Sequence, residues 1–81
     1  MTWTESDNAL HRAIKTPDFL TSFNLVSRLV APAEAMNHHP DIRFGWGYVE
    51  ITLTSHDSGK VTARDHALAA KIDEAIKTFG L

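Results

Sequence analysis

The sequence predicts an antiparallel sheet with helices packed on one of its faces. Two observations indicate this class: two hairpin-like regions are marked by turn signals, the second also by alternating apolar residues, and apolar residues recur at helical spacing in two longer segments. These strands and helices are segregated along the chain, which favours an antiparallel sheet. With 81 residues, the chain is expected to form a single domain, residues 1–81, without a second core.

The first hairpin is expected to pair Trp3–Glu5 with Ala9–Lys15, because the intervening Ser6-Asp7-Asn8 is a turn signal. A second hairpin is predicted farther along the chain, where Gly47 permits a turn. Its strands follow from alternating apolar residues, namely Ile42, Phe44 and Trp46 before the turn and Val49, Ile51 and Leu53 after it.

The first helix is expected to begin at Pro17, with Thr16 as its cap and Asp18 near its positive end. Pro32 predicts a kink or a restart, because its nitrogen cannot donate to the Arg28 carbonyl. The helix should end before His38-His39-Pro40. Its predicted buried face consists of Phe19, Phe23, Val26, Val30 and Ala33, widened by Leu20, Leu29 and Met36.

The last helix is predicted to open at Thr62-Ala63-Arg64-Asp65, which resembles a capping box, and to end at Gly80. Its apolar stripe runs from Leu68 to Phe79. One small sheet is not expected to cover this stripe, and a chain of this length buries little surface alone, so we expect an obligate oligomer.

Composition narrows the function classes. The net charge of −2 comes from scattered charges without a basic stripe, so direct nucleic-acid binding is not expected. The chain has no cysteine for a disulfide, a thiol nucleophile or a thiolate metal site. Its start lacks the features of a secretion signal, and no apolar run approaches the length of a membrane span. We therefore expect a soluble cytoplasmic protein without membrane association.

Histidines are the candidate chemical groups. The chain has five, and His38, His39 and His56 fall in its central part. Imidazole suits proton transfer because both of its forms are available near neutral pH. Metal binding is the competing interpretation, but adjacent residues in extended chain point to opposite sides and the usual ligand spacings are missing, so we expect no metal. A serine nucleophile is disfavoured because there is no nucleophile-elbow motif.

The spacing of these residues is more specific than their number. Glu34 precedes His38-His39-Pro40, and Trp46, His56 and Asp65 follow at fixed intervals. This pattern resembles the signature of the pterin-4a-carbinolamine dehydratases, and the resemblance runs from about Ala9 to Ile76. It implies an α+β fold with a four-stranded antiparallel sheet and helices on one face. It also implies a homodimer joined sheet edge to sheet edge, often paired into a homotetramer.

The resemblance implies a hydro-lyase that converts a 4a-hydroxytetrahydropterin to a quinonoid dihydropterin during tetrahydrobiopterin recycling. His38, His39 and His56 are the expected catalytic residues, with His38 and His56 as the acid–base pair and His39 orienting the pterin. Asp65, Glu34 and Trp46 are the further candidates for substrate binding. The elimination changes no oxidation state, so no cofactor is expected. The implied partners are the pterin substrate and further copies of the chain.

Several alternatives stay open. Asp65 is equally explained as a helix-capping acid. The surface interpretation is favoured for Glu34, as a helix carboxylate, and for Arg64, whose alternative is a contact with the pterin carbonyl. Trp46, like Phe44, is expected in the core or the pocket wall. His11 and His66 lie outside the pattern and are expected to be solvated. For the whole protein, the alternatives are a non-enzymatic dimerisation or assembly partner on the same fold, and a dehydratase-like protein of molybdopterin metabolism.

Overall fold

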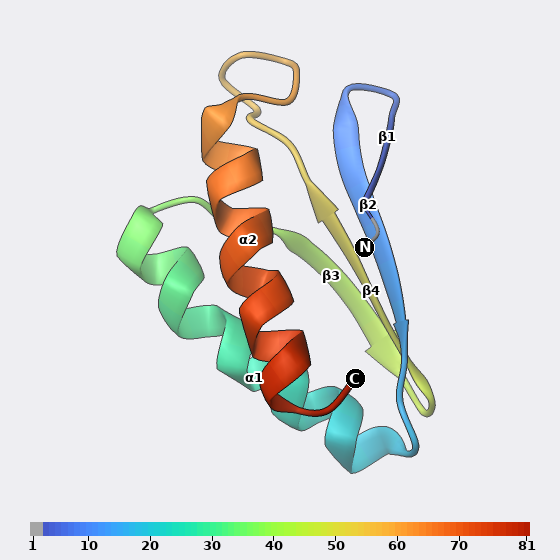
Figure 1. Cartoon of the computed structure of the whole chain (residues 1–81). Helices are drawn as coiled ribbons and strands as arrows, with labels where there is room; N and C mark the ends of the chain where they lie inside the picture. The colour runs from blue at the N-terminus through green and yellow to red at the C-terminus, as the bar shows by residue number, and fades with distance from the viewer. Residues whose placement is uncertain (1–2) are drawn as a thin grey trace.

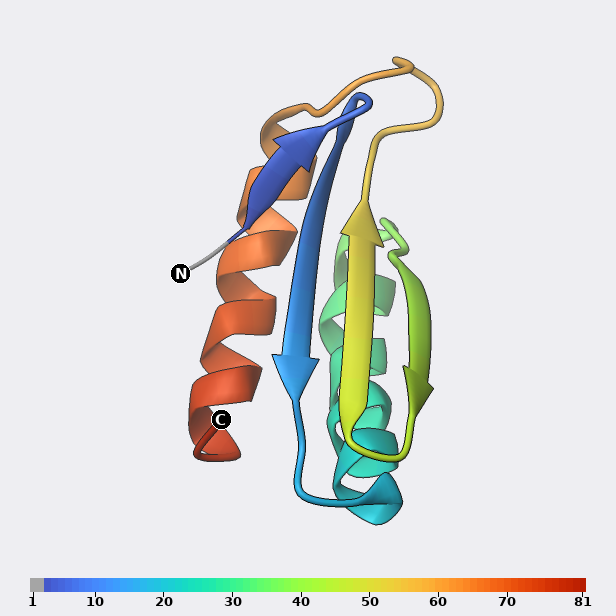
Figure 2. The same cartoon turned by 90° about the vertical axis from the view of Figure 1, so that its right-hand side faces the viewer.

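A computed structural model describes residues 3–81, so the expectation about the start of the chain lies partly outside it. Within these residues, four strands form one antiparallel sheet in the order β1-β2-β4-β3. Both helices lie against the same face of this sheet (Figures 1 and 2), which confirms the predicted α+β fold. The elements are β1 (Thr4–Ser6), β2 (Ala9–Lys15), α1 (Phe19–Met36), β3 (Asp41–Gly45), β4 (Tyr48–Leu53) and α2 (Ala63–Thr78).

The first hairpin turns through two residues with left-handed backbone. Asp7 and Asn8 have φ angles of 52° and 62°, and Ser6 pairs with Ala9 across them. A two-residue turn with two positive φ angles matches the twist of the flanking strands, and Asp and Asn tolerate this conformation well. The predicted hairpin is confirmed, although its first strand lies one residue later than expected.

The second hairpin turns at Trp46 and Gly47, between the paired residues Gly45 and Tyr48. Gly47 has a φ of 89°, which favours glycine. The hairpin is confirmed, but Trp46 belongs to the turn and not to the strand. β4 alternates as predicted, and its inward residues Val49, Ile51 and Leu53 form the centre of the core.

Helix α1 begins later than expected. Its N-cap is Asp18, whose Oδ1 accepts the Thr21 N–H at 2.7 Å. The expected cap at Thr16 and helical start at Pro17 are therefore wrong. A carboxylate at the N-cap satisfies a free N–H and complements the positive helix end, which explains why the helix starts at this position.

Pro32 does not divide α1. The helix continues through it to Met36 and ends before His38 as predicted. The predicted restart is wrong, while a bend at Pro32 stays a prediction. Because Pro32 has no N–H, the Arg28 carbonyl receives no helical hydrogen bond from it.

The buried face of α1 also differs from the prediction. The residues that face the sheet and α2 are Ser22, Leu25, Leu29 and Ala33. Of the predicted face, Ala33 and Leu29 are buried, and Val26 and Met36 are partly buried against the core. The rest is exposed: Phe19 by 52%, Leu20 by 65%, Phe23 by 51% and Val30 by 55%. An apolar face of α1 is thus uncovered in the single chain.

Helix α2 has the apolar stripe that its sequence predicts, and the sheet and α1 cover it. Leu68, Ile72 and Ile76 are at most 2% exposed. The expectation that a small sheet leaves this stripe uncovered is therefore wrong. Neither α1 nor α2, the helices of residues 3–81, combines the length and the apolar character of a bilayer-spanning helix.

Candidate active site

Three segments that are distant in sequence converge at one end of the sheet. Because β3 and β4 are antiparallel, with Asp41 opposite Thr52, the residues before β3 and those after β4 lie at the same end. The start of α2 lies there too (Figure 1). The segments surround a pocket of about 240 Å³, lined by Asn37, His38, His39, Thr54, His56, Asp57 and Arg64. The three predicted histidines therefore line one pocket.

The end of α1 orients the first of these histidines. Asn37, the C-cap, has left-handed backbone with φ 50° and ψ 44°. The His38 N–H returns to the Ala33 carbonyl at 3.1 Å. This reversal satisfies a free carbonyl at the helix end and directs the chain back over the core. As a result, His38 is only 7% exposed.

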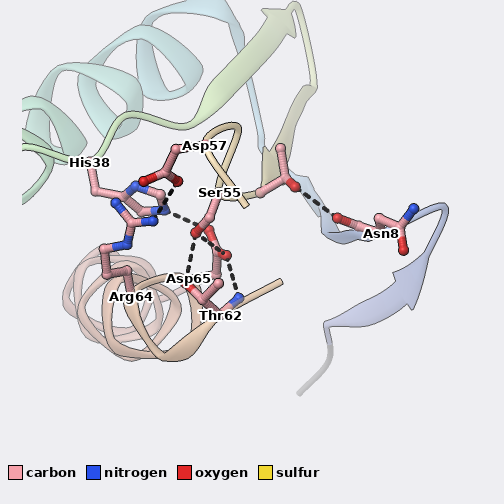
Figure 3. Close-up of polar contacts among 8 residues, drawn as sticks. Asn8, His38, Ser55, Asp57, Thr62, Arg64 and Asp65 are labelled. Atoms are coloured by element: carbon pink, nitrogen blue, oxygen red, sulfur yellow. Dashed lines mark hydrogen bonds and ion pairs between the residues drawn. The ribbon is translucent and has the colours of Figure 1, made fainter. Parts of the chain in front are cut away.

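A buried carboxylate holds the His38 ring. The Nε2 atom of His38 lies 2.5 Å from Oδ1 of Asp65, which is fully buried (Figure 3). The other carboxylate oxygen, Oδ2, accepts the Ser55 hydroxyl at 2.9 Å and the Thr62 N–H at 2.8 Å. Asp65 therefore caps α2, which is one of its two expected roles, and also contacts His38; its role in substrate binding stays a prediction.

Opposing effects act on the pKa of Asp65. Burial raises it, because a buried charge is poorly solvated. The hydrogen bonds from His38, from the Thr62 N–H and from Ser55 lower it by more, so the pKa lies below its ordinary value of 3.8. Asp65 is therefore a carboxylate at neutral pH, and it accepts the proton on His38 Nε2.

This contact leaves Nδ1 of His38 as the ring nitrogen that is available for chemistry. Within residues 3–81, Nε2 is the atom that bonds to protein, and no buried side-chain nitrogen or oxygen lacks a hydrogen-bond partner. A carboxylate behind an imidazole fixes its tautomer and stabilises the positive charge that forms when the ring takes up a proton. His38 therefore has the arrangement of an oriented acid or base.

His39 has a different carboxylate partner. Its Nε2 lies 2.7 Å from Oε2 of Glu34, and both side chains are exposed. The two adjacent histidines therefore have different carboxylate partners: His38 contacts the buried Asp65, and His39 contacts the exposed Glu34. Glu34 reaches the site through His39 and does not line the pocket. Among residues 3–81, no three side chains of the His, Cys, Asp and Glu types are grouped to hold a metal.

His56 lies on an exposed turn that follows β4. The next residue, Asp57, forms an ion pair of 2.6 Å with Arg64 of α2, and this contact with the guanidinium lowers the pKa of Asp57. Arg64 is exposed at the surface, as expected, and also forms part of the pocket wall. This exposed ion pair therefore links the turn that carries His56 to the start of α2.

Trp46 is not brought to this pocket within one chain. It is 72% exposed, so the expected core position is wrong, and it does not line this pocket within one chain. The pocket lies near the start of β3 and the end of β4, and the β3–β4 turn lies at the opposite end of the sheet (Figure 2). Five strand residues separate the two ends by roughly 15 Å. His66 is exposed as expected, whereas His11 is partly buried and bonds to the Ser6 carbonyl at 3.1 Å.

Ser55 is a site residue that the sequence analysis did not include. It is 1% exposed and contacts Asp65. A signal was present in the sequence, because the inward alternation of Val49, Ile51 and Leu53 places residue 55 on the same buried side. A buried hydroxyl requires a polar partner, and Asp65 is that partner.

Comparisons with known proteins identify the family of this chain. Residues 1–75 match the family model described as pterin 4 alpha carbinolamine dehydratase. A protein of Picosynechococcus sp. named "Putative pterin-4-alpha-carbinolamine dehydratase" is 40% identical over 72 residues, 89% of this chain and 78% of the relative. One of the same name from Solibacter usitatus is 44% identical over 71 residues, 88% of this chain and 75% of the relative.

Two solved structures have a similar fold. The "transcriptional coactivator/pterin dehydratase" of Brucella melitensis is 31% identical with a TM-score of 0.84, over 90% of this chain and 80% of that chain. A pterin dehydratase-like RuBisCO assembly factor of the alpha-carboxysome has a TM-score of 0.72, over 91% of this chain and 86% of that chain, and its 24% identity supports the fold alone. By its family match and its curated relatives, this chain belongs to the pterin 4 alpha carbinolamine dehydratase family.

Proposed function

We propose that the protein is a hydro-lyase that dehydrates a 4a-hydroxytetrahydropterin to a quinonoid dihydropterin. The observation that carries this proposal is the pocket in which His38, His39 and His56 meet, with His38 oriented by a buried carboxylate. The family supports a pterin dehydratase, and proton transfer is the chemistry for which these side chains are suited.

In the proposed reaction, an imidazolium donates a proton to the 4a-hydroxyl group, and the C4a–O bond breaks to release water. A neutral imidazole accepts the proton from the neighbouring ring nitrogen, whose electron pair forms the new C=N bond. The atoms balance as loss of one water, without oxidation or reduction, so the reaction itself calls for no redox cofactor. We assign the acid and base roles to His38 and His56 as a pair.

The remaining site residues have orienting roles in this proposal. His39, held by Glu34, binds the pterin edge at the rim of the pocket. Asp65 acts through His38 by fixing which ring nitrogen carries the proton. For Trp46, contact with the pterin stays a prediction from the family pattern, because within one chain it lies at the far end of the sheet.

A role in tetrahydrobiopterin recycling, in the cytoplasm, is part of the same proposal. The test is stopped-flow measurement of dehydration, with 4a-hydroxytetrahydropterin generated by an aromatic amino acid hydroxylase in the same mixture. The purified protein should accelerate dihydropterin formation in proportion to its concentration. A rate equal to the uncatalysed rate would refute the proposed activity.

We also propose that a second copy of the chain covers the exposed face of α1, which consists of Phe19, Leu20, Phe23 and Val30. Arg28 is the first charged side chain within this helix, so the stretch from Phe19 to Ser27 carries no charge. An apolar patch of this kind on a small domain indicates association.

A non-enzymatic assembly role is the second candidate function. The name of the Brucella melitensis structure, which is 31% identical to this chain, includes transcriptional coactivator as well as pterin dehydratase. The exposed face of α1 supplies a surface for such association. Inactivity in the stopped-flow assay, together with stable oligomer formation, would favour this candidate.

A further inference from the structure

We infer that Ser55 is a positioning residue that sets the placement of His38 relative to His56. This inference rests on the proposed function, because it concerns the geometry of the proposed acid–base pair. Ser55 does not line the pocket. Its side chain acts on His38 through Asp65, and its backbone acts on His56 through the turn that carries it.

The Ser55 side chain acts on His38 through Asp65. Its hydroxyl donates to Asp65 Oδ2 at 2.9 Å, while the opposite oxygen, Oδ1, contacts His38 Nε2 at 2.5 Å. Ser55 Oγ also lies 2.7 Å from Oγ1 of Thr62. Since the single Ser55 proton goes to Asp65, the Thr62 hydroxyl is the donor in that second contact. The hydroxyl of Ser55 therefore holds the carboxylate of Asp65 at the oxygen that does not contact His38 (Figure 3).

The Ser55 backbone acts on His56 by closing the turn that carries it. The Ser55 N–H donates to the Lys60 carbonyl at 3.2 Å, and the Ser55 carbonyl accepts the N–H groups of Ser58 at 3.0 Å and Gly59 at 2.9 Å. Gly59 has a φ of 67°, which suits glycine and allows the turn to close. His56 therefore projects from a turn whose base is the same buried residue that contacts Asp65.

These two sets of contacts connect the histidines through one short path of His56, Ser55, Asp65 and His38. Without the Ser55 hydroxyl, Asp65 keeps the Thr62 N–H at Oδ2 and His38 at Oδ1, and the carboxylate is held by two hydrogen bonds in place of three. Any rotation moves Oδ1 and with it the His38 ring. Catalytic rates are sensitive to shifts of about 1 Å in reacting groups, which cost up to about 100-fold.

The test compares Ser55→Ala with Ser58→Ala. The control makes the same substitution in the same turn at an exposed residue, and no side-chain hydrogen bond of Ser58 is present among the described residues. We expect Ser55→Ala to lower kcat about 10-fold with little change in KM, because the reacting groups are displaced and substrate contacts are kept. Ser58→Ala should stay within about 2-fold, and Ser55→Thr, which keeps the hydroxyl, should recover most of the activity.

A second measurement separates positioning from a general structural role. In folded protein, ¹⁵N NMR of the imidazole nitrogens should show His38 protonated on Nε2 in the wild type and in Ser58→Ala. In Ser55→Ala the His38 nitrogen shifts should move towards a mixture of tautomers. If Ser55→Ala does not fold, Ser55→Cys, with a similar volume and a weaker donor, takes its place.

Wild-type kcat and unchanged His38 nitrogen shifts in folded Ser55→Ala would overturn the inference. This result differs from a failure of the proposed function, which would appear as a wild-type protein without dehydratase activity. In that case the NMR comparison still decides whether Ser55 positions His38, because it does not depend on turnover.

Discussion

His38 Nε2 lies 2.5 Å from Asp65 Oδ1, although 27 positions separate the two residues in the chain. The same carboxylate accepts the Thr62 N–H at the start of α2. One buried acid therefore begins a helix and holds a histidine at the end of the other helix. Stability and the proposed chemistry depend on this one group.

Replacing Asp65 with Asn should destabilise the fold by about 1–3 kcal/mol, because an amide cannot accept hydrogen bonds at both of its polar atoms and leaves a buried donor unsatisfied. Urea unfolding at pH 7 measures this change. Asp57→Asn is the matched control, since its carboxylate is exposed and its ion pair with Arg64 is screened by water. Equal losses in the two variants would contradict a special role for the buried acid.

The pH dependence of stability should also change in Asp65→Asn. The pKa of Asp65 is lower in the folded protein than its ordinary value of 3.8, so its ionised form stabilises the fold above that value. This contribution is lost as the pH falls through the folded-state pKa. Between about pH 5 and pH 2, the free energy of unfolding should fall more steeply in the wild type than in the variant. Parallel curves from urea titrations at several pH values would refute this assignment.

Replacing Phe23 with Asp on the exposed face of α1 should shift the protein towards monomer, because a charge opposes burial of this face. Sedimentation velocity at low micromolar concentration measures the shift, and the wild type should sediment as a dimer or larger species. Ala70→Asp is the control, since Ala70 is exposed on α2 outside this face. A wild-type protein that is a folded monomer would contradict the proposed association.

Replacing Pro32 with Gln should stabilise the fold, by up to about 3 kcal/mol, because it restores a helical N–H opposite the Arg28 carbonyl. Helix α1 already continues through Pro32, so the replacement needs no change of path. Thermal and urea unfolding measure the gain. A loss of stability would show that the proline ring makes packing contacts that outweigh the missing hydrogen bond.

Local signals in the sequence predicted most of the elements but not the buried face of α1. The stripe through Phe19, Phe23 and Val30 has regular helical spacing, yet the helix packs through Ser22 and Leu25. Spacing identifies an apolar stripe but not which of two neighbouring stripes meets the sheet. Ser22 can be buried because its hydroxyl has hydrogen-bond partners, at 2.6 Å from Thr16 Oγ1 and 3.2 Å from the Asp18 carbonyl.

The candidate site was predictable as a set of residues and not as a set of contacts. Motif spacing selected His38, His56 and Asp65, and strand pairing places the first two at the same end of the sheet. The contact between His38 and Asp65 depends on how α2 docks against α1, which no local pattern encodes. Trp46 was misplaced because alternation continued into the turn, where Gly47 ends the strand.

The proposed acid–base pair predicts a specific kinetic pattern for the histidine variants. His38→Ala or His56→Ala should lower kcat by about 100-fold or more with a modest change in KM, since each removes a proton transfer made in the transition state. His39→Ala should mainly raise KM, because a lost orienting contact weakens binding of the ground state and the transition state alike. Stopped-flow kinetics measure both constants.

The double variant and the controls complete this test. The loss in the double replacement of His38 and His56 should be smaller than the product of the single losses, because residues that act as a unit are not additive. His66→Ala, at an exposed position outside the pocket, should behave as wild type, and circular dichroism should show every variant folded.

His38 is buried and bonded to Asp65, so a loss of activity in His38→Ala alone does not separate an effect on folding from an effect on chemistry. His56 is exposed on its turn, which makes it the cleaner variant. A folded His56→Ala with nearly wild-type turnover would therefore remove it from the acid–base pair.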